Sequence, residues 1–510
     1  MLAGKFRSSR CSAEISAKII SLKKIYTNGD MQTNSKAQGQ LVRSLGLFSA
    51  IILVVSSIIG SGIFKKVAPM SAELLSPGLV LFCWLLAGVV SLFGALSNAE
   101  VAGLLADSGG EYVYYRRIYG RLFAFLYGWA SFAVIRSASI ASIAYVFAQS
   151  FNSLYALPVL PPQIARISLL GIFQPFDNFG VKLLAISLVW LLTGVNYRGL
   201  RFGGGVSSVV TGTVVVGIVL IVVAGLTVGG GSWVNIQTNA PDYVSRSWTD
   251  PSLMNTIFTA MLAAFWGYEG WSSLGYIGGE IKNPNRNIPL ALTFGVLSVI
   301  VIYLAVNFTY LYVLPVTDFV QIHDSKNTIA AVAVVNSFWG KTGVLLISLL
   351  ILIATFGCTN TTILLSSRLY YKMANQGLFF KKADFIHPRY NTPSFALVMQ
   401  AGWASVLVLS GSFDQLTDML IFASFIFYGA TTLGVFILRR QMPDAPRPYR
   451  VIGYPVVPGL FIIFCILLIA NTLIERPREA GIGLFLIFTG LPFYFYWRKN
   501  SHAASEGGEI

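Results

Sequence analysis

The stretch Ile58-Ile59-Gly60-Ser61-Gly62-Ile63-Phe64 interrupts an apolar run, from about Leu45 to Leu75, that otherwise has the hydropathy of a membrane-spanning helix. Two glycines and a serine in succession weaken a helix, and a break inside a bilayer leaves backbone N–H and C=O groups unpaired. Transporters use such breaks to bind the charged ends of a small solute. The stretch therefore predicts a broken transmembrane helix beside a substrate site.

The composition of the whole chain indicates a membrane protein. Hydrophobic residues make up 55% of the 510 residues, charged residues make up 11%, and the mean hydropathy is +0.68. A soluble protein of this length is far less apolar. The apolar runs extend over about 20 residues, which predicts helices and not a β-barrel. The four cysteines and three histidines are scattered along the chain, so we expect neither a metal site nor a cofactor.

The apolar runs predict about twelve membrane-spanning helices in an all-α polytopic fold. The expected spans are Leu45–Leu75, Gly78–Leu104, Leu122–Phe151, Val181–Asn196, Val206–Val228, Leu253–Ile277, Ile288–Leu314, Ile329–Lys372, Pro393–Leu409, Leu416–Leu438, Tyr454–Thr472 and Ile482–Trp497. The Pro-rich segment from Ser153 to Gly180 is expected to be an outer loop or a partly embedded segment. Residues 1–43 are expected to form a disordered basic tail, in which Met31 is a second candidate start, residues 44–498 the transporter domain, and residues 499–510 a C-terminal tail.

The basic residues predict the orientation of the chain. Most of the 36 lysines and arginines fall in segments that share one side of the membrane if both termini are cytoplasmic. This asymmetry indicates an even number of spans in the cell membrane, with both tails inside. The clusters that carry most of it are Arg116, Arg117 and Arg121; Lys372, Lys381, Lys382 and Arg389; and Arg439, Arg440, Arg447 and Arg450. The net charge of +15 therefore indicates topology and contact with anionic lipid, and not nucleic-acid binding.

The sixth span contains a second break, Phe265-Trp266-Gly267-Tyr268-Glu269-Gly270-Trp271. It falls five spans after the first, and an odd offset reverses direction in the membrane, so the two broken helices are expected to belong to an inverted repeat. The helix that starts after Gly62 offers amides to an anion, whereas the helix that ends near Trp266 offers carbonyls to a cation. An α-amino acid carries both charges. The alternative is that these glycines only allow close helix packing.

The two breaks also resemble a known family when they are taken with three further motifs. These motifs are Gly279-Glu280-Ile281-Lys282-Asn283-Pro284, Ser366-Ser367-Arg368-Leu369-Tyr370, and Arg447-Pro448-Tyr449-Arg450-Val451. Together they resemble the amino acid, polyamine and organocation (APC) superfamily, and within it the L-type amino acid transporters and the bacterial serine/threonine exchangers. The resemblance covers about Leu45 to Trp497.

The resemblance implies a LeuT-like five-plus-five inverted repeat with two added C-terminal helices, and sodium-independent exchange of neutral L-amino acids. The implied substrate-binding residues are Ser57, Ile58, Ile59, Gly60, Ser61, Gly62, Trp266, Gly267, Glu269 and Gly270. Within this set, Ser57, Ile58, Ser61 and Gly62 would contact the carboxylate, and the backbone at Ile59, Trp266 and Glu269 would contact the amine. Trp266 also occupies the position of the family's aromatic gate.

The sequence departs from the family pattern at two places. The outer segment Ser150 to Gln163 has no cysteine, so no disulfide-linked heavy chain is expected. The fifth span has Thr211-Gly212-Thr213-Val214-Val215 where many relatives carry a lysine near the sodium position of sodium-coupled cousins. The mode of coupling therefore stays open between exchange and proton symport.

Arg136 and Glu269 lie deep within predicted spans, where charged residues are functional candidates. They either neutralise each other or act in side-chain recognition and proton coupling. Glu269 therefore keeps cationic amino acids or polyamines open as alternative substrates. A second group, Thr355, Cys358, Thr359 and Asn360 in the eighth span, is interpreted as helix packing. Tyr428 and Ser424 in the tenth span are candidates for lining the cavity.

Three further classes of function compete with exchange. A membrane enzyme has little support, because the chain has no HExxH motif and Gly340-Lys341-Thr342 lacks the upstream glycine of a P-loop. A channel is the second competing class, and a uniporter or proton symporter is the third. Counterflow distinguishes them, since an exchanger accumulates labelled substrate only against an internal partner solute.

Overall fold

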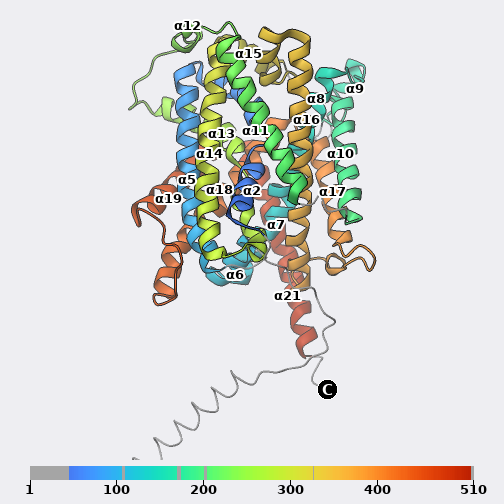
Figure 1. Ribbon diagram of the computed structural model, residues 1–510. Coiled ribbons are helices and arrows are strands. Elements are labelled where there is room, and N and C mark those ends of the chain that lie inside the picture. Colours follow the sequence, from blue (N-terminus) through green and yellow to red (C-terminus); the bar gives the residue numbers. More distant parts are fainter. Residues whose placement is uncertain (1–44, 106–109, 169–173, 200–203, 326, 507–510) are drawn as a thin grey trace, which may run out of the picture. The chain divides into compact units, whose positions relative to one another are not determined.

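The computed structural model describes residues 45–105, 110–168, 174–199, 204–325 and 327–506, and these residues form helices (Figure 1). No β-strand occurs within these ranges, where one isolated parallel bridge joins Leu45 to Ile281. The predicted tail of residues 1–43, with Met31, lies outside the described residues, and so does the end of the chain from residue 507. The all-α fold class is confirmed.

The helices follow one another along the chain in the order expected for a polytopic protein. They are α2 (Leu47–Ile58), α3 (Gly62–Lys65), α4 (Val67–Leu74), α5 (Pro77–Leu104), α6 (Glu111–Ile118), α7 (Arg121–Ala130), the π-helical η1 (Ser131–Ile135), α8 (Arg136–Leu154), α9 (Pro162–Ala165), α10 (Phe179–Tyr197), α11 (Gly204–Thr227), α12 (Trp233–Gln237), α13 (Pro251–Tyr268), the 3₁₀-helical η2 (Trp271–Glu280), α14 (Pro284–Val313), α15 (Val316–Asp324), α16 (Ala330–Asn375), the 3₁₀-helical η3 (Lys381–Asp384), α17 (Ser394–Ser410), α18 (Phe413–Gln441), α19 (Val456–Glu475), α20 (Pro477–Phe488) and α21 (Gly490–Glu506).

Local sequence explains where several of these helices begin. Proline occupies the first helical position of α5, α13 and α14, where the missing N–H would have no partner in any case. The side chain of Asp250 caps α13 by accepting a hydrogen bond from the Ser252 amide at 2.8 Å. Ser412 and Gln415 form a reciprocal capping box at the start of α18.

Every predicted span contains a helix, and nine helical segments in the described ranges are long and apolar enough to cross a membrane. The number of crossings, twelve, and the inverted repeat stay predictions. The segment Arg121–Leu154 is central, since 94% of the residues in its most apolar 18-residue stretch are buried. By contrast, α19 and the segment Pro477–Arg498 are peripheral, with 33% and 28% buried. Their exposed apolar side chains are suited to contact with lipid.

Some predicted spans are interrupted where the sequence analysis expected one helix. The eighth span, predicted as Ile329–Lys372, is a merged run of 46 residues that Gly340 divides with φ of +55°. An unbroken helix of that length would measure about 69 Å, far more than a bilayer core of about 30 Å. The third span contains η1, and the twelfth divides at Thr489 between α20 and α21. The segment Ser153–Gly180 holds the short α9 and exposed residues in its described part, as an outer loop would.

The short elements divide between the two ends of the helix bundle (Figure 1). The elements α9, α12 and α15 lie at one end, called the α15 end below. The elements α6 and α21 lie at the other, called the α6 end. The first helix break lies between these ends, where α3 packs against α13 and α16. The fold thereby brings segments 200 and 300 residues apart in the chain to one point.

Candidate functional site

The first helix break lies within the predicted stretch. Its second helix begins at Gly62, one residue earlier than predicted. Helix α2 ends at Ile58, Ile59 has an extended ψ of 90°, and helix α3 begins at Gly62. No side chain caps the start of α3, so its first amides are not paired with a capping group. Lys66 keeps right-handed helical dihedral angles between α3 and α4, and the helical path therefore continues from Gly62 to Leu74.

The second break is also confirmed. Helix α13 ends at Tyr268, Glu269 is extended, and Gly270 has a φ of +118° before η2 begins at Trp271. That value of φ favours glycine. A Cβ at Gly270 would also lie 2.2 Å from the carbonyl oxygen of Ser57, so the second break presses directly against the end of α2.

The two breaks touch through their glycines. A Cβ placed on Gly62 would lie 2.5 Å from the Cα of Gly267, a separation that real side chains do not reach. Trp266 spans the same contact, because its indole Nε1 donates a hydrogen bond of 3.3 Å to the hydroxyl of Ser61. Close packing and a substrate site are therefore not exclusive explanations for these glycines. The packing is what brings both broken helix ends to one place.

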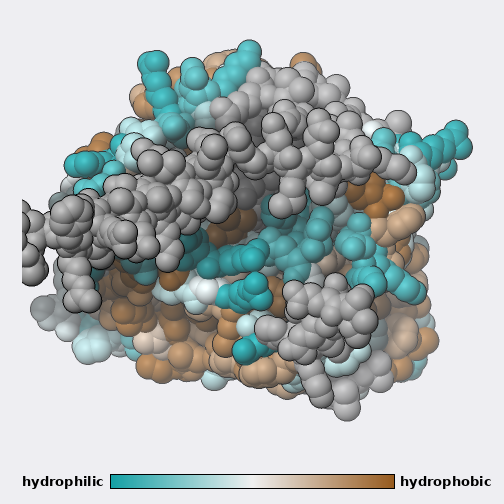
Figure 2. Space-filling model, turned by 90° about the horizontal axis from the view of Figure 1, so that it is seen from below, coloured by the Kyte–Doolittle hydropathy of each residue, from teal (hydrophilic) through white to brown (hydrophobic). Residues whose placement is uncertain are grey.

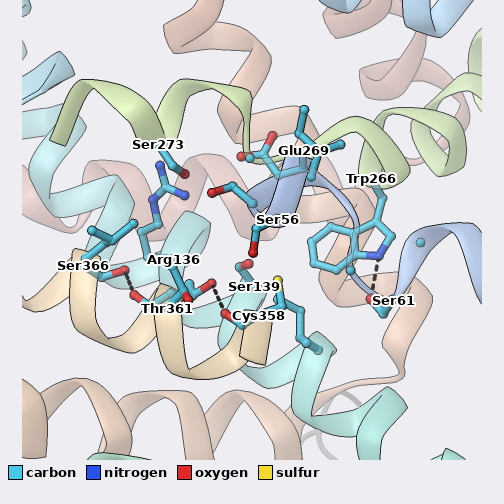
Figure 3. Close-up of a pocket in the computed structure, with 18 residues that line it drawn as sticks. Ser56, Ser61, Arg136, Ser139, Trp266, Glu269, Ser273, Cys358, Thr361 and Ser366 are labelled. Carbon is cyan, nitrogen blue, oxygen red and sulfur yellow. Dashed lines mark hydrogen bonds between the residues drawn. The ribbon is translucent and has the colours of Figure 1, made fainter. Parts of the chain in front are cut away.

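A small cavity of about 40 Å³ lies at this meeting point (Figure 3). The predicted residues that line it are Ser57, Ile58, Gly60, Ser61, Gly62, Trp266, Glu269, Gly270 and Arg136. Ile59 and Gly267, which were also predicted to bind substrate, are buried behind its wall and do not line it. A Cβ at Gly267 would meet the ring of Trp84 at 2.7 Å, so its glycine serves the packing of α13 on α5.

Arg136 and Glu269 bring opposite charges to this one cavity. Arg136 begins α8 directly after the π-helical η1, an extra-wide turn of the kind that is frequent at functional sites. Figure 3 shows its guanidinium pointing toward Ser273 on η2. The Glu269 carboxylate accepts a hydrogen bond from the Tyr428 hydroxyl, which lies 2.8 and 2.9 Å from its two oxygens. The neutralising role and the functional role of this pair both stay predictions.

Several residues of the cavity wall were not identified from the sequence. They are Ser56, Ser139, Ile143, Ser273, Thr361, Thr362, Leu365 and Ser366. The wall of α16 consists of positions 358, 361, 362, 365 and 366, which repeat at the spacing of one helix face. On α8, Arg136, Ser139 and Ile143 follow the same rule. A search for small polar residues at helical spacing would have found the face of α16 but not that of α8, where only Ser139 is of this kind.

In the eighth-span cluster, which the sequence suggests serves helix packing, Asn360 makes a contact between helices, and Thr355 and Thr359 are buried and bonded within α16. Thr355 and Thr359 donate hydrogen bonds to backbone carbonyls one turn earlier in α16. Asn360 accepts a hydrogen bond of 2.8 Å from Asn196 on α10. Cys358 differs, because it lines the cavity and its Sγ would lie 3.3 Å from a Cβ on Gly60.

The tenth-span candidates, Tyr428 and Ser424, do not line the cavity. Tyr428 lies behind Glu269 and holds its carboxylate, while Ser424 is buried one turn earlier in α18. The prediction that they line the cavity was wrong, because Glu269 of the second break lies between Tyr428 on α18 and the cavity. In the fifth span, Thr211 and Val214 of the segment that departs from the family pattern lie on α11 and are buried.

Tyr303 on α14 joins the two breaks, and no pattern in the sequence indicates this role. Its hydroxyl lies 3.0 Å from the carbonyl oxygen of Ile58 and 2.9 Å from that of Gly267, and its one proton is shared between these two acceptors. These carbonyls stand at the ends of α2 and α13, where no helical partner remains for them. The Tyr303 ring packs edge-on against Trp84, with centroids 5.5 Å apart. One buried phenol thus satisfies both interrupted helices.

A layer of larger side chains separates the cavity from the α15 end. Trp266 meets the ring of Phe413 edge-on at 6.1 Å, and Lys66 lies over that ring with its Nζ 4.7 Å from the centroid. The Lys66 Nζ also donates to Asp414 at 2.7 Å and to Thr417 at 2.8 Å. These contacts join α13 and the junction of α3 with α4 to α18, on the side of the cavity toward the α15 end. A second cavity of about 440 Å³, lined in part by Lys65 and Asp414, lies beyond them.

The chain resembles membrane transport proteins over most of its length. A family model described as amino acid permease matches residues 45–495. The serine/threonine exchanger SteT of Bacillus subtilis (strain 168) is 31% identical over 462 residues, which cover 90% of this chain and 98% of the relative. The b(0,+)-type amino acid transporter 1 of Homo sapiens is 29% identical over 467 residues, covering 91% and 90% of the two chains.

A third relative is similar over a comparable length. The large neutral amino acids transporter small subunit 2 of Mus musculus is 29% identical over 483 residues, covering 93% of this chain and 85% of the relative. The family match includes both helix breaks and the whole of the cavity wall. The chain is a multi-pass membrane protein of the amino acid permease family, within the APC superfamily that its two breaks and the accompanying motifs resemble.

Proposed function

We propose that this chain is a secondary transporter that exchanges neutral L-amino acids across the cell membrane by alternating access, without sodium. The observation that supports it most directly is the convergence of two broken helix ends on one cavity. Helix α3 begins there with amides that no side chain caps, and α2 and α13 end there with their carbonyls. These ends carry partial charges of opposite sign.

The carboxylate of an amino acid fits the start of α3, at Ser61 and Gly62, where partial positive charge faces the cavity. The amine fits the opposite wall, where the end of α13 and Glu269 supply negative charge. Ser57, Ile58 and Gly60 complete the first wall, and Gly270 completes the second. Trp266 closes the cavity toward Phe413 and is the proposed gate.

Trp266 lines this cavity and Phe413 lines the larger one toward the α15 end, so these two rings must separate to admit a solute from that side. This need is consistent with alternating access, in which the site opens to one side at a time. The layer formed by Trp266, Phe413 and Lys66 is a natural place for that opening at the α15 end. We infer a transporter and not an enzyme, because the relatives are named as exchangers and transporters.

A neutral substrate is favoured because Arg136 and Glu269 contribute opposite charges to one cavity. The names of two relatives, a serine/threonine exchanger and a large neutral amino acids transporter subunit, agree with that choice. A cationic amino acid or a polyamine is the second candidate, since Glu269 reaches the wall and could face a positive side chain. Proton symport is the second candidate for coupling.

The decisive experiment is exchange by the purified chain in liposomes. Vesicles loaded with serine, threonine, leucine or lysine, or left empty, are given radiolabelled serine with and without sodium. Exchange predicts uptake only into vesicles loaded with an accepted amino acid, at equal rates with and without sodium. Uptake into empty vesicles that follows an imposed proton gradient would instead identify a symporter. The chain is reconstituted alone, because no heavy chain is expected.

The variant Glu269→Gln separates substrate recognition from general damage. If Glu269 takes part in the cycle, the variant will change the pH dependence of serine exchange or the acceptance of lysine. Glu475→Gln is the matched control, since Glu475 is an exposed carboxylate at the end of α19. An unchanged pH profile together with an unchanged substrate range would remove Glu269 from the proposed mechanism.

A further inference from the structure

A third cavity, of about 470 Å³, lies at the α6 end of the bundle and is separate from the transport site. Its wall is formed by α6 and its connection to α7, by the end of α16 and by α21. The residues that line it are Arg116, Tyr119, Arg121, Leu122, Gln376, Leu378, Tyr494 and Arg498. Three of these eight are arginines, and none of the eight is acidic.

The uncharged side chains of this cavity are held in place by the surrounding fold. The Tyr119 hydroxyl donates a hydrogen bond of 2.6 Å to the carbonyl oxygen of Ala430. Gln376 accepts a hydrogen bond of 2.9 Å from the Tyr112 hydroxyl. Tyr494 is buried, and its ring packs against Phe125 with centroids 5.3 Å apart. The cavity is therefore a built feature and not a gap between exposed side chains.

The arginines are exposed at the rim, and none of the described residues that line the cavity carries a negative charge to balance them. No carboxylate of the described residues forms an ion pair with Arg116, Arg121 or Arg498. Arg439, at the same end, differs because it forms a bidentate pair with Glu100. Three guanidinium groups line one cavity whose described wall holds no acidic side chain, and this arrangement favours an anion supplied from outside.

The chemistry of the wall selects phosphate as that anion. Guanidinium groups bind phosphate oxygens through paired, charge-assisted hydrogen bonds. Leu122, which is 39% exposed, stands beside the arginines and offers an apolar contact. Figure 2 shows hydrophilic side chains gathered over this end with hydrophobic surface at its edge. A molecule with a phosphate group next to a hydrocarbon chain could contact the arginines with its phosphate and Leu122 with its chain.

We propose that this cavity binds the phosphate headgroup of an anionic membrane lipid, with an acyl chain along Leu122. Basic pockets between helices at the cytoplasmic surface are suited to such headgroups. A soluble phosphate ester presents the same anion but has nothing to place against the leucine, and we therefore assign the site to lipid. A bound lipid would connect α6, α16 and α21 through one shared ligand.

Native mass spectrometry of the purified full chain tests the proposal. The protein is titrated with phosphatidylglycerol, with phosphatidylcholine and with glycerophosphoglycerol, which is the same headgroup without acyl chains. The double variant Arg116→Gln, Arg121→Gln should bind phosphatidylglycerol about tenfold more weakly, as the loss of charge-assisted contacts predicts. Its matched control is Arg117→Gln, Arg440→Gln, which removes the same charge from exposed residues at the same end, outside the cavity.

The outcomes differ clearly. Equal weakening in the two double variants, or equal binding of the two lipids by the native chain, would overturn the site. Glycerophosphoglycerol binding as tightly as phosphatidylglycerol would overturn the assignment to lipid. If the first double variant does not fold, the single variant Arg498→Gln replaces it, because Arg498 is exposed on α21. That variant should weaken phosphatidylglycerol binding and leave phosphatidylcholine binding unchanged.

Discussion

At the scale of single residues, Tyr303 is the side chain on which the geometry of both breaks depends. Its hydroxyl is the donor to Ile58 and to Gly267, two carbonyls that the interrupted helices leave unpaired. A buried carbonyl without a donor is costly, and the one hydroxyl of Tyr303 serves the ends of both α2 and α13. The position of the breaks is therefore maintained from α14, a helix that does not line the cavity.

Replacing Tyr303 with Phe should destabilise the protein and impair transport together. The substitution keeps the ring against Trp84 and removes only the hydroxyl. The carbonyls of Ile58 and Gly267 then lose the donor they share, which should lower the free energy of unfolding by roughly 1–3 kcal/mol. The checks are the apparent melting temperature in detergent and the rate of serine exchange. Tyr310→Phe is the control, since Tyr310 is equally buried on the same helix. Identical results for the two variants would contradict the role given to Tyr303.

At the scale of secondary-structure elements, the α6 end is held by a clamp between α5 and the segment after α18. The Glu100 carboxylate receives two hydrogen bonds from Arg439, at 2.9 and 2.7 Å, and one of 2.7 Å from the Val451 amide. Arg447 lies 3.5 Å away and donates to the last carbonyls of α18, among them that of Leu438. The Arg447-Pro448-Tyr449-Arg450-Val451 motif is thus a structural motif of this clamp.

Glu100→Gln should lower the apparent melting temperature markedly, because it leaves the buried guanidinium of Arg447 and the Val451 amide facing a neutral group. Removing one partner of a buried ion pair costs roughly 3–5 kcal/mol, whereas an exposed pair contributes about 0–1 kcal/mol. The comparison is Glu73→Gln, whose pair with Arg476 has side chains 35% and 40% exposed. Thermal unfolding of both variants in one detergent measures the difference. Equal shifts would mean that the clamp is not stabilising.

At the scale of the whole molecule, the arrangement of charge predicts which end of the bundle faces the cytoplasm. The arginine-rich loops gather at the α6 end, and the positive-inside rule places that end in the cytoplasm. The α15 end would then face outward. This orientation agrees with the proposed lipid site, because anionic lipids enrich the cytoplasmic leaflet.

Cysteine labelling checks the orientation directly. In a cell, Ser325→Cys at the α15 end should react with a membrane-impermeant maleimide, whereas Lys382→Cys in η3 should react only after permeabilisation. Both positions are exposed, and Cys83, Cys358 and Cys465 are buried, so the native thiols of the described chain contribute little background. Labelling of Lys382→Cys in intact cells would reverse the assigned orientation.

The sequence alone determined the membrane fold and both helix breaks. It also determined most of the cavity lining that comes from the breaks themselves. These features depend on local properties: hydropathy along about 20 residues, and glycines that a continuous helix disfavours. For that reason Gly60 to Gly62 and Trp266 to Gly270 could be recognised without any knowledge of their neighbours. The motifs that accompany them then indicated the permease family.

The tertiary structure alone decided which side chains meet at those breaks. It placed the face of α16 from Cys358 to Ser366 in the wall, and it turned Ile59 and Gly267 away from the cavity. It also brought Tyr303 and Tyr428 behind the breaks from helices far along the chain. Such contacts depend on how helices rotate and cross when they pack, and the hydropathy of a uniformly apolar span does not specify which of its faces turns inward.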